Sequence, residues 1–460
     1  MTIPAWGMIP FVVLLGCIAV LPLVKATEHW WEKNTSKLGV ALVLGIPVAI
    51  WIWLGEGSLP VAHALVEYAQ FITLLGSLFV ISGGIFLAGD LLAKPRNNLT
   101  FLAIGAVLAS FIGTTGAAML LIRPILNMNA ERRHKVHTVV FAILVVANSG
   151  GLLTPLGDPP LFLGMLRGVP FTWTFQLFPE WLFTNVMLLI TYFGLERRAY
   201  AREEEADIQH DIEMLRPLRV RGGQNLLLLG VVVLAVAFAP SINLDVLHGG
   251  HHYPITDYIP WRELIMIAAA AISYFATAKR TRFHDNEFTW DPILEVAALF
   301  IGIFLTMIPA LKYLAQVAPK LPLNEITFFV FSGGLSSVLD NAPTYATFFE
   351  MAAQLPGEPR VAGVPEAYLV AISLGAVFCG ALTYIGNGPN FMVKSVAESR
   401  GVAMPSFGGY VVWTFQYMVP VLVAMVLIFI ADAWLWHILG IVLALALALR
   451  AFLLARAHRV

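Results

Sequence analysis

Two aspartates lie within long apolar stretches of this sequence, where an ionisable side chain can take up a proton or a small cation. Asp158 follows the run LTPLG at 153–157, and Asp340 precedes Asn341. A charged group in apolar surroundings is costly and, within a membrane segment, by default marks an ion or proton path. A carboxylate that binds either H⁺ or Na⁺ supplies the minimal chemistry of ion exchange.

Hydroxyl and amide side chains accompany both aspartates. Small hard cations such as Na⁺ prefer several oxygen ligands, from carboxylates, hydroxyls, amides and backbone carbonyls. No resident cofactor is expected, because Na⁺ and H⁺ would be cargo; Asp158, Asp340 and Asn341 are the residues expected to bind the transported sodium. The predicted ion-binding or substrate-binding residues are Thr114, Thr115, Asn148, Ser149, Thr154, Asp158, Ser337, Asp340, Asn341, Thr344, Thr383, Asn387 and Asn390.

A purely structural role is the competing interpretation of these residues. Asp158 is followed by two prolines, and aspartate before proline is typical of a helix N-cap followed by the first helical residue. Asn341-Ala342-Pro343 and Asn387-Gly388-Pro389 allow the same interpretation. Capping and ion binding can also coexist in one residue.

The motif around Asp158 recurs late in the chain. Residues 153–160 read LTPLGDPP and residues 382–389 read LTYIGNGP. Glycine and proline at this density interrupt an α-helix. A helix broken within a membrane is tolerated where its freed backbone groups line an enclosed cavity. Two such breaks at corresponding positions indicate the binding site of a secondary transporter.

Composition independently indicates a membrane protein. Hydrophobic residues make up 58% of the 460-residue chain, charged residues 12%, and the mean hydropathy is +0.78. Soluble domains carry roughly 25% charged residues. We therefore expect an all-α polytopic membrane protein whose partners are membrane lipid and small inorganic cations. A net charge of −1 gives no reason to expect nucleic-acid binding, and no nucleophile–base pair suggests an enzyme.

The apolar segments predict two inverted repeats. The first, 1–195, contains a re-entrant hairpin at 99–126 and a broken helix at 137–165. A cytosolic linker at 196–222 leads to the second repeat, 223–460, with a hairpin at 324–350, a broken helix at 366–393 and a C-terminal helix. With both hairpins re-entrant, most Lys and Arg residues lie on one face, which the positive-inside rule makes cytoplasmic. The N-terminus is then outside and the C-terminus cytoplasmic, in what we expect is a bacterial inner (plasma) membrane.

Three stretches resemble the ion transporter superfamily: ANSGGLLTPLGD at 147–158, SVLDNAPT at 337–344 and IGNGPN at 385–390. The first is most similar to NhaD-type sodium/proton antiporters, and the superfamily also includes citrate-type transporters and arsenite permeases. The resemblance implies two opposed hairpins, a homodimer and an elevator-type mechanism of alternating access. The tip of the first hairpin departs from the NhaD pattern, because it reads Gly113-Thr114-Thr115 where an Asp-Asn pair is usual.

Two functions follow from this resemblance. The primary hypothesis is exchange of sodium or lithium for protons by a secondary active transporter. The alternative is sodium- or proton-coupled transport of citrate or another di- or tricarboxylate. Two acidic residues favour a cation, whereas an anion would be helped by a basic residue, and Arg123 is the one basic residue close to either break. An ion channel is a third possibility, which the paired hairpins argue against.

Overall fold

The computed structural model describes all residues except 1, 90, 205–216, 243–257 and 457–460. The described chain is almost entirely helical, which confirms the predicted all-α membrane class. Two short antiparallel strand pairs interrupt the helices: β1 (Phe86–Ala88) with β2 (Arg219–Arg221), and β3 (Arg360–Val361) with β4 (Val364–Pro365). Both pairs join segments outside the long helices.

Six helical segments in the described residues are long and apolar enough to cross a membrane. The protein is therefore an integral membrane protein. Large apolar side chains point outward, among them Leu54 and Phe275, each 84% exposed. Such surfaces are unfavourable in water and favourable in lipid. The six segments are Asn34–Glu56 (α3), Leu59–Ser82 (α4), Phe171–Tyr200 (ending in α9, Phe178–Tyr200), Asp291–Lys320 (starting with α13, Asp291–Val317), Phe407–Phe429 (α18, Phe407–Tyr417, and α19, Val419–Phe429) and Trp434–Arg456 (α20).

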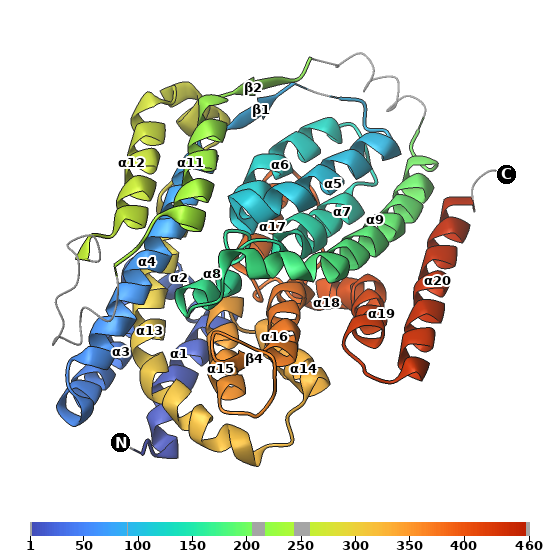
Figure 1. Ribbon diagram of the computed structural model, residues 1–460. Coiled ribbons are helices and arrows are strands. Elements are labelled where there is room, and N and C mark those ends of the chain that lie inside the picture. The colour runs from blue at the N-terminus through green and yellow to red at the C-terminus, as the bar shows by residue number, and fades with distance from the viewer. Residues whose placement is uncertain (1, 90, 205–216, 243–257, 457–460) are drawn as a thin grey trace.

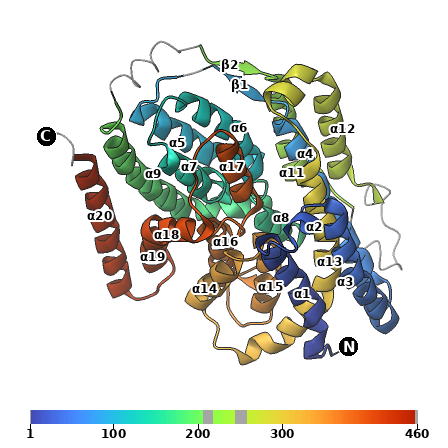
Figure 2. The ribbon, with the colours of Figure 1, turned by 180° about the vertical axis from the view of Figure 1, so that it is seen from behind.

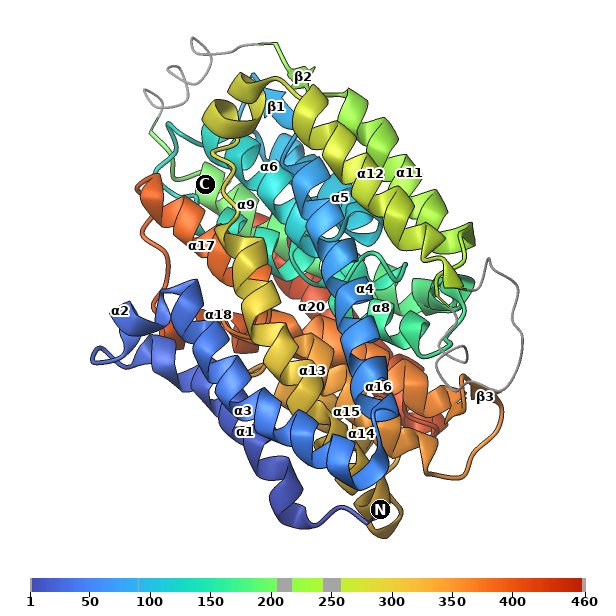
Figure 3. The same cartoon turned by 90° about the vertical axis from the view of Figure 1, so that its left-hand side faces the viewer.

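Long helices form one side of the molecule, as Figure 3 shows. In it α13 packs against α3 and α4, and α4 packs against α12 (Trp261–Ala276), which pairs with α11 (Gln224–Phe238). The contact between α13 and α3 is close, because a Cβ added at Gly302 would lie 2.7 Å from the backbone of Ala41. The N-terminal helices α1 (Ile9–Val20) and α2 (Glu28–Trp31) lie beside this group, while α9, α19 and α20 pack together on the opposite side (Figures 1 and 2).

Two pairs of shorter helices lie between these groups (Figure 1). In the first pair, α5 (Pro95–Ile112) and α6 (Thr114–Met128) meet at Gly113, whose φ of +81° favours glycine. In the second, α14 (Glu325–Ser336) and α15 (Asn341–Ala353) are joined by residues 337–340. The predicted hairpins 99–126 and 324–350 fall within these pairs. That each pair enters and leaves by one face of the membrane stays a prediction.

Each predicted broken helix contains a non-helical segment. In the first broken helix, α7 (Val136–Phe141) continues as π-helical and 3₁₀ turns to Leu152. After a non-helical gap the chain resumes as α8 (Pro159–Leu166). The second is α16 (Glu366–Cys379), extended by a 3₁₀ turn to Leu382, followed after a gap by α17 (Gly388–Ser399). Proline is favoured in the first turn of a helix and disfavoured in its interior, which is consistent with α8 and α17 starting where prolines occur.

The predicted linker at 196–222 begins inside a helix. α9 continues through Glu196 to Tyr200, and the linker ends in β2. The helix persists because Glu196 is fully buried and accepts hydrogen bonds from Asn98 (2.9 Å) and Arg132. The central part of the linker lies outside the described residues.

Candidate functional site

The first break is attached to the tip of the first hairpin by hydroxyl groups. Ser110 Oγ donates to the carbonyl of Gly150 (2.5 Å) and accepts from the N–H of Leu153 (3.1 Å). Thr154 Oγ1 donates back to the carbonyl of Ser110. These bonds satisfy backbone groups that lose their helical partners where the helix stops.

Backbone contacts then fix the residue before the aspartate. The N–H of Thr114, at the start of α6, donates to the carbonyl of Gly157 (2.8 Å). A Cβ at Gly157 would lie 2.1 Å from the carbonyl oxygen of Gly151, so no other residue fits there without a shift. Asp158 is thereby held at the start of α8, facing the hairpin tip.

Asp158 is 1% exposed and receives neutral donors from three other segments. Thr114 Oγ1 donates to its Oδ1 (2.9 Å), Asn387 Nδ2 lies 3.4 Å from the same oxygen, and Asn341 Nδ2 donates to Oδ2 (2.5 Å). The ion pairs found among the described residues do not include Asp158. A buried carboxylate without a cationic partner is costly unless a proton or a cation neutralises it.

Asp158 occupies the N-cap position of α8, as its sequence predicts, but its side chain does not cap the helix. Its side chain makes no capping hydrogen bond, and the first two residues of α8, Pro159 and Pro160, have no N–H to offer. Asn387 also makes no capping bond to α17. Asp340 does cap: its Oδ1 accepts from the N–H of Ala342 (3.3 Å) at the start of α15. The two aspartates therefore have different roles.

A chain of amides connects the first break to the second. Asn387 Nδ2 donates to Asn148 Oδ1 (3.1 Å), and Asn148 Nδ2 donates to Asn390 Oδ1 (2.6 Å). Asn390 Nδ2 in turn donates to the carbonyls of Gly380 and Thr383 at 2.8 and 2.9 Å. All three asparagines are buried. These bonds fix the orientation of the amide that reaches Asp158.

The second break repeats the hydroxyl contacts of the first. Thr383 Oγ1 donates to the carbonyl of Ser337 and accepts from the N–H groups of Ile385 and Gly386, both at 3.2 Å. Ser336 Oγ donates to the carbonyl of Ala376 (2.7 Å), as Ser110 does to Gly150. Both breaks are thus held to a hairpin by a threonine, while the serine contact of the second hairpin is made to α16, before the break.

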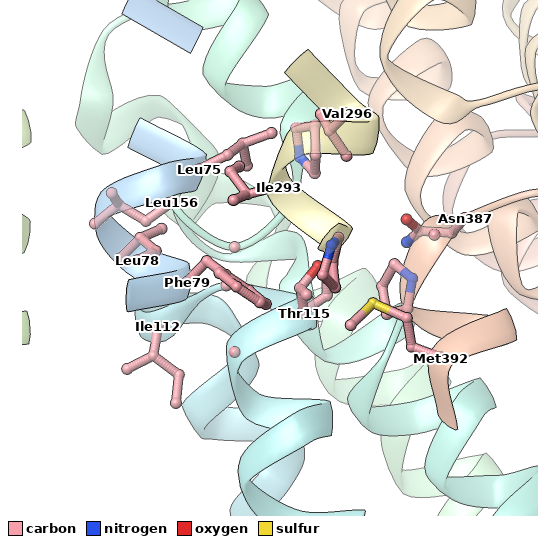
Figure 4. A pocket seen from close by; sticks show the side chains of 18 of the residues that line it. Leu75, Leu78, Phe79, Ile112, Thr115, Leu156, Ile293, Val296, Asn387 and Met392 are labelled. Atoms are coloured by element: carbon pink, nitrogen blue, oxygen red, sulfur yellow. The ribbon is translucent and has the colours of Figure 1, made fainter. Parts of the chain in front are cut away.

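A cavity of about 100 Å³ lies beside these residues (Figure 4). Thr115, Asp340 and Asn387 contribute polar atoms to its wall, and Leu75, Leu78 and Ile293 form an apolar side. Four helices begin around it: α6, α8, α15 and α17 start at Thr114, Pro159, Asn341 and Gly388. Helix N-termini carry partial positive charge and favour anions.

The structure gathers only part of the predicted set around Asp158. Ser149 instead donates to Asn185 in α9 (2.8 Å), Thr344 to the carbonyl of Asp340 (3.1 Å), and Ser337 to the carbonyl of Gly334 (2.7 Å). Ser336, which donates to the carbonyl of Ala376 in α16, was not among the predicted residues. The predicted residues that contact Asp158 or line the cavity beside it are Thr114, Thr115, Asp340, Asn341 and Asn387. Asn148 and Asn390 are connected to Asn387 by hydrogen bonds.

An integral membrane protein in which two broken helices and two hairpin tips surround one buried carboxylate has the features of a transporter. A family model described as "Putative citrate transport" matches residues 1–430, and the chain belongs to this family. It is therefore a transporter and not an enzyme.

Three relatives are annotated only in general terms. An uncharacterized transporter of Mycobacterium tuberculosis is 25% identical over 449 residues, covering 92% of this chain and 98% of its own length. A second uncharacterized transporter of that organism is 26% identical over 358 residues, covering 75% and 77%. A 46 kDa membrane protein of Mycobacterium leprae is 26% identical over 352 residues, also covering 75% and 77%.

Proposed function

We propose that this protein is a cation-coupled transporter of citrate or a related di- or tricarboxylate, and that Asp158 binds the coupling Na⁺ or H⁺. The observation that carries the proposal is the buried Asp158 carboxylate surrounded by the neutral donors Thr114, Asn341 and Asn387. Such a group is stable when neutralised and must exchange its proton or cation as the protein works. The family to which the chain belongs supports a carboxylate substrate.

Charge balance supports coupling to a cation. Citrate carries several negative charges, Asp340 adds another at the cavity, and the lining residues include no Lys or Arg. The charge of Asp340 also acts on Asp158. Partial positive charge from the starts of α6 and α17 favours carboxylate binding, but two neighbouring acids oppose it until one is neutralised. A cation must therefore accompany the anion.

Asn341 supplies a further oxygen for that cation. Its Nδ2 is occupied by Asp158, whereas its Oδ1 is buried and accepts no hydrogen bond. Oδ1 of Asn341, the hydroxyl of Thr114 and the carboxylate of Asp158 together offer the oxygen ligands that Na⁺ prefers. In this mechanism, a cation at Asp158 allows a carboxylate to bind the adjacent helix starts, and release of the cation on the other side expels it.

The remaining architecture is part of the same proposal. We infer two inverted repeats, each with a re-entrant hairpin, that move as an elevator-like domain within a homodimer. The membrane is a bacterial inner membrane, with the N-terminus outside and the C-terminus in the cytoplasm. The distribution of Lys and Arg residues and the recurring break supports this arrangement.

Sodium/proton exchange of the NhaD type is the second candidate. It is favoured by a specific observation: Asp340, which lines the cavity, and Asp158, which is buried behind its wall in contact with the lining residues Thr114 and Asn387, are both acids. In that case Na⁺ or Li⁺ is the cargo, and the protonated and cation-bound forms of Asp158 alternate.

Flux into proteoliposomes separates the two functions. The purified protein is reconstituted with an imposed Na⁺ or pH gradient, and uptake of labelled citrate is measured in parallel with a pH-sensitive dye. Citrate accumulation driven by either gradient supports the proposed function. Sodium-dependent proton movement with no citrate uptake overturns it and supports exchange.

A further inference from the structure

A second cavity adjoins the one beside Asp158. It has a volume of about 70 Å³, and its wall includes the hydroxyl-bearing residues Ser82 and Thr289. The two cavities share Phe79, Pro292 and Met392 as lining residues, so they meet at these side chains. Figure 4 shows Phe79 and Met392 at the wall of the first cavity. A substrate in the second cavity would therefore lie next to the first.

Arg123 lines this second cavity with hydrogen-bonding capacity unused. It lies on α6, the helix that begins at Thr114 in the first cavity, and its side chain is 7% exposed. Its Nε is buried and has no hydrogen-bond partner, and Nη2 makes only a long contact (3.3 Å) with Oε2 of Glu287. A buried guanidinium with a free donor is costly, so an unmet donor of this kind indicates a missing acceptor.

The Glu287 contact shows what that acceptor is. Glu287 places a carboxylate against Arg123, although its own side chain is 68% exposed and its φ is +50°, in the left-handed region. The 3.3 Å contact is long for a charge-assisted hydrogen bond, and the Glu287 side chain lies on the exposed side of the pair, so another carboxylate can displace it. Arg400, at the end of α17, adds a second positive charge that acts on Arg123.

We propose that Arg123 binds a carboxylate in the second cavity, which forms a vestibule to the first. The transported anion docks there beside Glu287 or in its place, before it enters the cavity next to Asp158 or after it leaves that cavity. The inference rests on the proposed carboxylate transport. The free Nε and the weakly bound Nη2 form one edge of the guanidinium fork, which matches a carboxylate in a bidentate geometry. The first cavity contains no basic residue, so Arg123 supplies the full positive charge that the cavity lacks.

A structural latch is the competing explanation, since Arg123 and Glu287 also connect α6 to the segment before α13. The two explanations predict opposite effects of the Glu287→Gln substitution. If the pair is a latch, losing either partner has the same effect. If Arg123 binds substrate, losing Glu287 removes a competitor and tightens citrate binding, whereas losing Arg123 weakens it.

The test is the concentration dependence of citrate uptake by full-length protein in proteoliposomes. Arg123→Gln should raise KM about tenfold with the maximal rate changed less than about twofold, Arg123→Lys should fall between it and wild type, and Glu287→Gln should lower KM about twofold. Arg221→Gln is the matched control, because Arg221 pairs with Asp285 at 2.8 Å and lines neither cavity; its KM should stay at the wild-type value.

Each other outcome has a definite meaning. An unchanged KM in Arg123→Gln, or KM changes of the same sign in Arg123→Gln and Glu287→Gln, overturns the vestibule site while leaving the proposed function intact. A wild-type protein that takes up no carboxylate overturns the proposed function and the vestibule site with it. Should Arg123→Gln not fold, Arg123→Lys and Glu287→Gln still give the two opposite KM shifts.

Discussion

The two breaks, at 153–158 and 382–387, share a backbone arrangement and differ in chemistry. In each, a threonine (Thr154 or Thr383) donates to a carbonyl at the adjacent hairpin tip. In each, a glycine lies against the carbonyl of a residue earlier in the break. The residue that follows this glycine is Asp158 in the first break and Asn387, 229 positions later, in the second.

The aspartate and the asparagine at these matching positions make different hydrogen bonds. Asp158 accepts hydrogen bonds from Thr114 and Asn341, whereas Asn387 donates toward Asp158 and to Asn148. The shared serine, threonine and glycine contacts are what a broken helix needs to satisfy its backbone. The carboxylate is not needed for that purpose. In the proposed function, the second break therefore supports the ion site at Asp158 and does not form an equal site of its own.

The largest predicted effect comes from removing the two matched side chains. Asp158→Ala should lower citrate uptake by about 100-fold or more, because no other group in contact can replace the carboxylate. It should also cost about 1–3 kcal/mol of stability, since Asn341 Nδ2 loses its acceptor. Asn387→Ala should lower uptake only about tenfold, because it removes only the weaker 3.4 Å contact to Asp158. Equal losses in the two variants, measured as initial uptake rates, would contradict the asymmetry.

The glycines test whether the backbone arrangement is shared. A Cβ would lie 2.1 Å from the carbonyl oxygen of Gly151 in Gly157→Ala and 2.6 Å from that of Gly380 in Gly386→Ala. Overpacking of this kind typically costs about 1–3 kcal/mol or more. Both variants should give less folded protein on size-exclusion chromatography, with Gly157→Ala the worse. Gly230→Ala, where the added Cβ meets nothing within 4 Å, is the control and should fold normally.

Asp340→Asn compares the capping aspartate with the buried one. The amide oxygen can still accept from the N–H of Ala342, so thermal stability should stay near that of wild type. Uptake should fall about tenfold, because the negative charge that helps to attract the coupling cation to Asp158 is lost while the ligands of that cation remain. A loss as complete as that of Asp158→Ala would show that the two aspartates act as an equal pair.

The smallest effect is predicted for the two threonines. Thr154→Val and Thr383→Val each remove the bond to a hairpin tip together with the hydroxyl that accepts from backbone N–H groups within the break. Each should cost about 1–2 kcal/mol of stability, by similar amounts, and change uptake little. The stability of each variant is measured by heating the protein and recording the fraction that remains folded. A strong loss in one variant alone would mean that the two breaks are not held in the same way.

Local sequence predicted where the helices stop, because proline and glycine act on their own backbone. Hydropathy predicted the helical membrane class, and α8 and α17 start at the prolines of the recurring motif. Sequence did not determine which polar side chains meet. Ser149 and Thr154 lie five residues apart in one break, yet one faces α9 and the other the hairpin tip.

Tertiary packing, and not local sequence, determines which polar side chains contact one another. Asn341 reaches Asp158 from 183 positions away, and only the docking of the second hairpin places it there. At that hairpin Ser336, and not its neighbour Ser337, faces α16, because adjacent residues of a helix point in different directions. Asp158 lies at the N-cap position that its sequence predicts, but its side chain does not cap the helix, for a similar reason. Its carboxylate accepts hydrogen bonds from Thr114 and Asn341 on other segments instead.

Gradient-driven accumulation by the Asp158→Asn variant tests the central claim most directly. The amide keeps the size of the side chain and can still accept from Thr114, but it cannot carry or release a charge. In proteoliposomes with an imposed Na⁺ or pH gradient, we predict that this variant is folded and does not accumulate citrate, or sodium if wild type exchanges cations, against its gradient. Accumulation at the wild-type level would show that Asp158 is not the coupling residue.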